Sequence, residues 1–132
     1  MEIFPGNFEC LYFTESDLEA PKIEGKTVTI PVKKVFPLRG HPLLDGKTAV
    51  MGINGVLVFR GVYSSKRVLT EYIGDPKHPD GYKAPYEIED MGTSTSSDTQ
   101  AFNTYSFEGV LEAPLAWVDW TIKSQSFEFR VE

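Results

Sequence analysis

Strand-forming segments follow one another along almost the whole chain, and this pattern constrains the fold more than any other feature. The segments are rich in Val, Ile, Phe, Tyr and Thr, are bounded by Gly, Pro, Asn and Ser, and show little helical periodicity. One helical turn is predicted over Glu15–Ala20, ending at Pro21. Eight strands are predicted, near Phe8–Thr14, Lys26–Phe36, Lys47–Ile53, Val56–Tyr63, Arg67–Ile73, Ala101–Leu111, Ala116–Ile122 and Phe127–Val131. The pattern predicts an all-β fold, either an antiparallel β-sandwich or a partly open β-barrel of about eight strands.

The length of the chain fits one domain. With 132 residues, two folding units would each be close to the size at which a hydrophobic core becomes marginal. The composition is 41% hydrophobic, and 9 Phe, 6 Tyr and 2 Trp supply large side chains for a core. We therefore expect a single all-β domain over residues 1–132.

A first hairpin is predicted at Asn54-Gly55. This pair is favoured in type I′ turns, because both turn positions need a positive φ. The turn would set Ile53 opposite Val56 and join two strands within residues 47–63 that are apolar on both faces. A strand pair of this kind is expected to be central in the fold and covered on both sides.

A second hairpin is predicted around a loop at Lys123–Ser126. This register would pair Trp120 with Phe129 on an apolar face and Asp119 with Arg130 on the opposite face. Trp120 would then point into the core.

Three residues predict irregularities within strands. Pro31 has no N–H for a ladder hydrogen bond, so its strand is expected to be an edge strand or a bulged strand. Gly61 and Gly109 lie where a bulge or a sharp bend would turn a long strand around a corner of the fold.

The 26 residues of Asp75–Gln100 are predicted to form a long acidic loop between the fifth and sixth strands. The first part is punctuated by Pro and carries Tyr82, Tyr86 and Ile88, which are able to pack. The part over Gly92–Gln100 is rich in Ser and Thr, and we expect it to be mobile.

Charge is distributed unevenly along the chain. The 13 Lys and Arg against 19 Asp and Glu give a net charge of −6. Residues 1–25 carry six acids and one base, residues 26–70 eight bases and one acid, and residues 71–132 twelve acids and four bases. Two interpretations follow. Either the basic strands lie beside the acidic ones and neutralise them, or the 75–100 segment and the C-terminal strands form an acidic patch that steers a basic partner.

The acidic balance argues against nucleic acid or an anionic membrane as the main partner. No apolar run approaches the roughly 18 residues that a membrane helix needs. The N-terminal Met1–Gly6 lacks the basic and apolar regions of a secretory signal. Cys10 is the single cysteine, so no internal disulfide can form. These features predict a cytoplasmic protein.

The motifs for catalysis and metal binding fail their structural requirements. Gly40–Thr48 ends like a phosphate-binding P-loop, but it has one residue too many between its glycines, and Pro42 lacks an N–H for the phosphate. Asp75, His78 and Asp80 could approach a metal, yet no second close His or Cys completes a zinc-like spacing. The chain also has no Gly-x-Ser-x-Gly nucleophile motif. We therefore expect no enzymatic activity, no cofactor and no metal.

These observations favour a non-enzymatic protein-interaction module. It would bind, and neutralise, a basic protein such as a nuclease toxin, in the manner of immunity proteins. An outward-facing indole at position 117 would act as an interface anchor. The predicted interface residues are Asp75, Asp80, Tyr82, Tyr86, Glu87, Glu89, Asp90 and Trp117.

Two alternatives remain open from the sequence. The aromatic residues could line a β-barrel that holds a small apolar or sugar ligand. A homodimeric structural or accessory subunit could instead form through the second apolar face of the 47–63 hairpin.

Overall fold

The computed structural model describes residues 2–44, 52–73, 81–91, 102–112 and 114–131, and nearly all of its regular structure is β. Within these ranges, 3-10 helices lie at Phe8–Cys10 and Pro42–Leu44. The strands are β1 (Glu2–Pro5), β2 (Leu11–Tyr12), β3 (Asp17–Leu18), β4 (Lys22–Glu24), β5 (Thr27–Pro37), β6 (Ile53–Glu71), β7 (Tyr86–Met91), β8 (Asn103–Glu112) and β9 (Leu115–Val131). The predicted all-β fold is confirmed.

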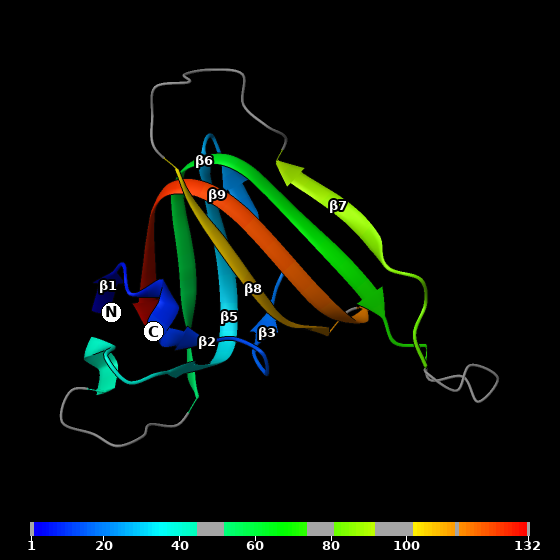
Figure 1. Ribbon diagram of the computed structural model, residues 1–132, viewed down its shortest axis with the longest axis horizontal. Coiled ribbons are helices and arrows are strands. Elements are labelled where there is room, and N and C mark those ends of the chain that lie inside the picture. Colours follow the sequence, from blue (N-terminus) through cyan, green and yellow to red (C-terminus); the bar gives the residue numbers. More distant parts are fainter. Residues whose placement is uncertain (1, 45–51, 74–80, 92–101, 113, 132) are drawn as a thin grey trace.

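Two long strands, β6 and β9, organise the molecule. They pair antiparallel along almost their whole length, from Gly55 opposite Val131 to Glu71 opposite Ala116, and they curve together through an arch (Figure 1). Because of this curvature, each long strand contributes to two sheets. One sheet contains β5, the first half of β6, the second half of β9, and β1. The other contains β7, the second half of β6, the first half of β9, and β8.

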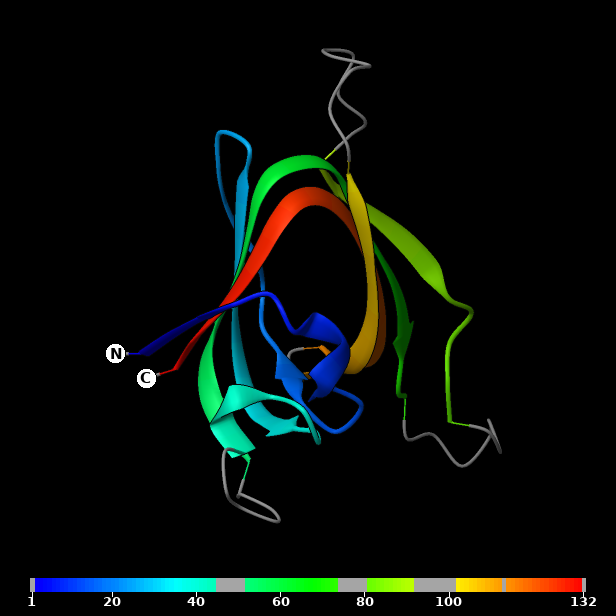
Figure 2. The same ribbon diagram turned by 60° about the vertical axis from the view of Figure 1, so that its left-hand side comes forward.

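The short strand β3 joins the two sheets on the side opposite the arch. It pairs antiparallel with β5 and, at Asp17, parallel with Val110 of β8. Strand pairing therefore runs in a closed circuit from β9 through β8, β3, β5 and β6 back to β9. The result is a small barrel, which Figure 2 shows from a second side, with β1 and β7 as extra strands at its margins.

The first predicted hairpin is wrong, because Asn54 and Gly55 lie inside β6. Gly55 pairs with Val32 on one side and Val131 on the other. A Cβ atom at Gly55 would collide with the backbone carbonyl oxygen of Arg130. The glycine is thus needed for a close approach between strands and not for a turn. The proposed partner segment 47–51 lies outside the described residues.

The second predicted hairpin is also wrong, because Lys123–Ser126 lies inside β9 at the arch. Trp120 pairs with Arg67 and Phe107 and not with Phe129. The side chain of Trp120 nevertheless faces the core, as expected, and the residue is 1% exposed.

The bend expected at Gly61 is confirmed. This residue has φ +64, and the register between β6 and β9 shifts immediately after it. At Gly109 the ladder is regular, so no bulge forms there. Because Gly109 has no Cβ, the side chain of Leu18 can pack directly against it. A Cβ atom at this position would lie only 2.7 Å from carbon atoms of Leu18.

Several other sequence expectations need correction. The Glu15–Ala20 segment contains the extended β3 and no helix, and the segment predicted as a first strand begins with a 3-10 helix. β5, which contains Pro31, is bulged as one of the two expectations had it, with the register shift between Val32 and Val35, but it is not an edge strand because it is paired on both sides. The carbonyl of Pro31 accepts from the N–H of Glu19. The missing N–H of Pro31 therefore faces the connection between β3 and β4, because N–H and C=O of one strand residue point to the same side.

The predicted long loop over residues 75–100 contains a strand. β7 pairs antiparallel with β6 from Leu69 opposite Tyr86 to Ser65 opposite Met91. The Gly92–Gln100 part, for which mobility is expected, lies outside the described residues.

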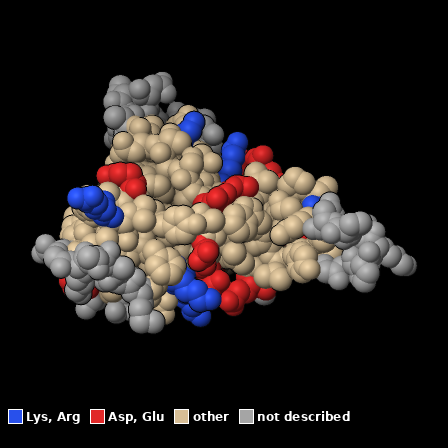
Figure 3. Space-filling view, turned by 60° about the horizontal axis from the view of Figure 1, so that its bottom comes forward, with Lys and Arg blue, Asp and Glu red and all other residues tan. Residues whose placement is uncertain are grey.

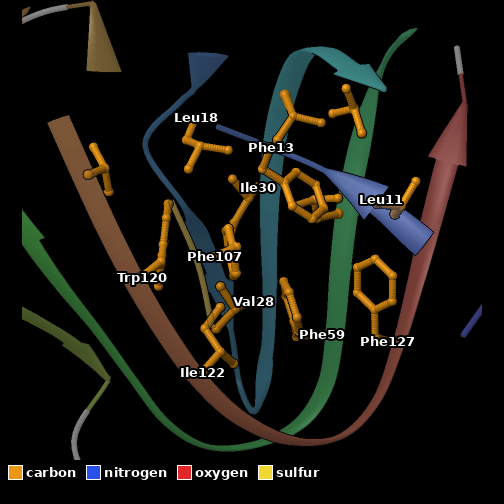
Figure 4. Packing of buried hydrophobic residues seen from close by; sticks show 14 of the residues in the cluster. Leu11, Phe13, Leu18, Val28, Ile30, Phe59, Phe107, Trp120, Ile122 and Phe127 are labelled. Carbon is orange, nitrogen blue, oxygen red and sulfur yellow. The ribbon is translucent and has the colours of Figure 1, made fainter. Parts of the chain in front are cut away.

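The interior between the sheets is filled by aromatic and aliphatic side chains (Figure 4). Phe59, Trp120 and Phe129 are the largest fully buried ones. Phe8, on the first 3-10 helix, closes the core beside β8, and its ring lies 4.9 Å from that of Tyr105 and 5.1 Å from that of Phe127. Aromatic pairs at such distances add to the stabilisation that burial supplies.

The fold mixes the charged segments of the chain. Lys33 and Lys34 of the basic segment pair with Glu19 and Asp17, and Arg60 pairs with Glu128. On the molecular face of Figure 3, acidic and basic side chains lie next to one another. These pairs agree with the interpretation that the basic strands neutralise acidic ones.

Candidate functional site

The sheet formed by β7, β6, β9 and β8 has an outer face, turned away from the core. Along β9, Trp120 and Val118 point inward and are at most 1% exposed, so Trp117, Asp119 and Thr121 point outward. Strand register then fixes which outward residues of the four strands lie in one row across the sheet.

One such row is acidic. Glu87 of β7 lies opposite Val68 of β6, Val68 lies opposite Asp119 of β9, and Asp119 lies opposite Glu108 of β8. We call Glu87, Asp119 and Glu108 the acidic row. Glu87 approaches Lys66 at 3.9 Å between Oε1 and Nζ.

The other two members of the acidic row lack a basic partner among the described residues. Glu108 is contacted by the hydroxyl of Thr14, at 3.5 Å from Oε1. Asp119 and Glu108 face each other directly across two strands, and like charges in this position destabilise a sheet. A cation bound beside them would relieve this repulsion.

An aromatic patch lies on the same face, at the end of the sheet. Tyr72, Tyr82, Leu115 and Trp117, which we call the aromatic patch, surround a depression of about 240 Å³. Tyr72, Tyr82 and Leu115 are 50%, 46% and 49% exposed, and Trp117 is half-buried. Trp117 and Asp119 are two residues apart on one strand, so the patch borders the acidic row.

Backbone pairing builds the aromatic patch. Tyr72 and Tyr82 form an isolated antiparallel bridge, and their rings meet edge to face at 5.5 Å. The N–H of Tyr72 donates to the carbonyl of Leu115 at 2.9 Å. Gly81, with φ +73, leaves room for the ring of Tyr72, which a Cβ at this position would meet at 2.5 Å. The two tyrosines are therefore held by main-chain geometry, although their rings are exposed.

The eight residues predicted to form the interface do not share one face. Tyr82 and Trp117 come together in the aromatic patch. Glu87 and Glu89 lie on β7 and are exposed. Asp75 and Asp80 lie outside the described residues.

Asp90, also expected at the interface, is buried against Arg67. Its carboxylate accepts two hydrogen bonds from the guanidinium, at 2.8 and 2.7 Å, and its side chain is 6% exposed. The guanidinium carbon lies 5.0 Å from the centre of the Trp120 ring, and the indole N–H of Trp120 donates to Ser65 Oγ at 3.0 Å. Asp90 therefore secures β7 to the barrel and carries no free charge for a partner.

Tyr86 pairs with Leu69, which is buried, so Tyr86 lies on the inner side of the sheet. A hydrogen bond to the carboxylate of Glu71 raises the pKa of Tyr86, with burial as a lesser cause. The tyrosine is thus turned away from the outer face that carries Trp117, although it is 39% exposed.

The described residues were also compared with the requirements of a metal site and of a membrane-spanning helix. No cluster of His, Cys, Asp and Glu suited to a metal occurs in the ranges that the structure describes. His41 is 3% exposed, burial lowers its pKa, and its Nδ1 accepts from the N–H of Leu43 at 3.1 Å. The group considered from the sequence as a possible metal site, Asp75, His78 and Asp80, lies outside the described residues. Over those same ranges, no helix is long and apolar enough to cross a membrane.

Sequence reasoning missed Tyr72, Leu115, Asp119 and Glu108. Asp119 and Glu108 could have been identified from the alternation of inward and outward residues in β9 and β8. That signal was lost because the predicted second hairpin placed Asp119 opposite Arg130.

Comparison of the chain with protein-family models, with curated proteins and with solved structures finds no match.

Proposed function

We propose that this protein is a non-enzymatic interaction module that binds a basic protein partner on the outer face of the β7–β6–β9–β8 sheet. The observation that carries the proposal is that an exposed aromatic patch lies next to an acidic row in which two carboxylates lack a basic partner among the described residues. Aromatic side chains that anchor a partner, next to charged side chains that orient it, are typical of protein interfaces.

The two parts of the face would act differently. The aromatic patch supplies large, rigid side chains around a depression, and residues of this type contribute most of the binding free energy in many interfaces. The acidic row supplies a local negative potential, which accelerates association with a positively charged surface and sets the orientation of the partner. The net charge of −6 acts in the same direction.

Basic enzymes that act on nucleic acids are one class of partner with this chemistry, because the surfaces that bind phosphates are rich in Lys and Arg. A module that covers such a surface would compete with the substrate. An immunity or inhibitor role is therefore the form of the proposal that we favour.

The alternatives are less well supported. A ligand held inside the barrel would have to replace the rings that fill it, among them Phe59, Phe129 and Trp120. Dimerisation through the second apolar face of the 47–63 segment has little exposed apolar surface to use, because Leu57 and Phe59 lie in the core and Val58, which alternation places on the other face, is 2% exposed. Arg60, Glu128 and Arg130 form a hydrogen-bonded group on the outer side of this part of β6.

Affinity capture from the source organism tests the proposal when three baits are compared by quantitative mass spectrometry. The baits are the wild type, Trp117→Ala, and Ile23→Ala as a control for an exposed apolar residue on β4. We expect a basic protein that the wild type and Ile23→Ala enrich equally and that Trp117→Ala loses. Enrichment of the same proteins by all three baits would contradict the proposal.

A further inference from the structure

A groove of about 510 Å³ lies beside the acidic row, between the N-terminal segment 8–14 and strands β8 and β9. Its lining includes three carboxylates, those of Glu9, Glu108 and Asp119, and among the described residues no Lys, Arg or His lines it. Phe13, Phe107 and Trp120 also contribute to the lining, and their side chains pack in the core (Figure 4). These three side chains are at most 8% exposed, so the accessible surface of the groove consists mainly of its acidic side chains and the partly exposed rings of Phe8 and Tyr12.

The three carboxylates of the groove favour a positively charged ligand. Glu108 and Asp119 lie directly opposite each other, and Glu108 is half-buried. Charges at a partly buried site interact more strongly than charges in open water, because the local dielectric constant is lower. A bound cation would thus be attracted by all three carboxylates and would remove the repulsion between two of them.

An exposed ring adds a preference between basic side chains. Tyr12 stands at the margin of the groove and is 40% exposed. A guanidinium group stacks on aromatic rings and bonds two carboxylate oxygens at once, whereas an ammonium is a compact and strongly hydrated charge. The apolar stem of an arginine would pack against the partly exposed rings of Phe8 and Tyr12.

We propose that this groove receives an arginine side chain from the basic partner. The inference rests on the proposed function, and it identifies the chemistry of the partner. Asp119 belongs to the groove and lies two residues from Trp117, which corresponds to about 7 Å along a strand. The partner would therefore carry an arginine about 7 Å from the apolar group that covers the aromatic patch.

An NMR titration tests the inference with a defined probe, the blocked peptide acetyl-Gly-Arg-Gly-amide. We expect the backbone amide signals of Tyr12, Ser106 and Thr121 to shift along one saturable curve. The corresponding Lys peptide should bind several-fold more weakly, and the Glu peptide should shift none of these signals.

Glu108→Gln combined with Asp119→Asn should raise the apparent Kd of the Arg peptide by roughly tenfold, since hydrogen bonds to charged groups are lost. The substitution removes a repulsion, so the variant should fold, which its NMR spectrum reports directly. Glu24→Gln, an exposed change on β4, is the matched control and should leave the Kd within about twofold. The inference is overturned if the Arg peptide shifts the signals of acidic residues evenly over the whole protein. It is also overturned if the double substitution leaves the Kd unchanged.

Trp117→Ala separates this inference from the proposed function. It should abolish capture of the partner and leave the peptide titration unchanged. If the peptide fails to bind the groove while partner capture still depends on Trp117, the arginine inference is wrong and the interaction surface stands. If the peptide binds and partner capture is independent of Trp117, the proposed function fails.

Discussion

The buried ion pair between Arg67 and Asp90 gives a sharp prediction for stability. Asp90→Asn keeps the shape of the side chain but removes the charge that balances Arg67, and the two side chains are 10% and 6% exposed. Removing one partner of a buried pair costs about 3–5 kcal/mol, because the remaining charge is left without compensation. An asparagine oxygen can still accept one hydrogen bond, so we expect a loss of about 3 kcal/mol in the free energy of unfolding.

Urea denaturation followed by tryptophan fluorescence measures this loss, since Trp120 lies beneath the Arg67 guanidinium. Glu87→Gln on the same strand is the matched control, because the Lys66–Glu87 pair is 3.9 Å long and about half exposed, and it should cost less than about 0.5 kcal/mol. Replacing both Arg67 and Asp90 by Leu should recover most of the loss. The reasoning is refuted if Asp90→Asn costs no more than Glu87→Gln.

Two further predictions concern the long paired strands. Gly55→Ala should destabilise the protein by about 2–3 kcal/mol, because the new Cβ collides with the Arg130 carbonyl. The control Gly6→Ala, where φ is +72 and no atom lies within 4 Å of the new Cβ, should cost about 1 kcal/mol. Thermal denaturation of both variants measures the two losses. Burial raises the pKa of Glu128, but hydrogen bonds from Arg130 and Arg60 outweigh it and hold that pKa below its ordinary value of 4.5. The ion-pair contribution of Glu128 is thus present at neutral pH and is lost as the pH falls below about 4.5 towards the folded-state pKa. Glu128→Gln should flatten this part of the stability–pH curve, and an unchanged slope would contradict the assignment.

The fold class could be predicted from the sequence, and so could the strands in which strand-forming residues follow one another regularly. The strand predicted at Lys26–Phe36 matches β5, and the segment at Ala101–Leu111 matches β8 within two residues. Trp120 faces the core because alternation along its own strand requires it. These features depend on local periodicity, which a single sequence contains.

Features that depend on distant partners were missed. Asn54-Gly55 has the local preference of a turn, yet the pairing of β6 with both β5 and β9 needs an extended chain with no Cβ at Gly55. β7 carries four acidic or polar residues in its six and reads as a loop, because its stabilisation comes from pairing with β6 and from Asp90.

The candidate site was predictable only in part, for the same reason. Tyr82 and Trp117 were identified from residue type, and the structure brings them to one patch. The pairing of Asp119 with Glu108 depends on the true register of β9, which the presumed turn at Lys123–Ser126 concealed. An acidic row across four strands therefore follows from topology and is not visible in any one segment.

The central claim is that the outer face of the β7–β6–β9–β8 sheet binds a basic protein. Isothermal titration of the captured, purified partner with the wild type, Trp117→Ala and Ile23→Ala tests it most directly. The account predicts that Trp117→Ala weakens the Kd by about thirtyfold or more, as expected for a hot-spot aromatic residue, while Ile23→Ala changes it by less than about twofold. A Kd for Trp117→Ala that stays within twofold of the wild-type value would contradict it.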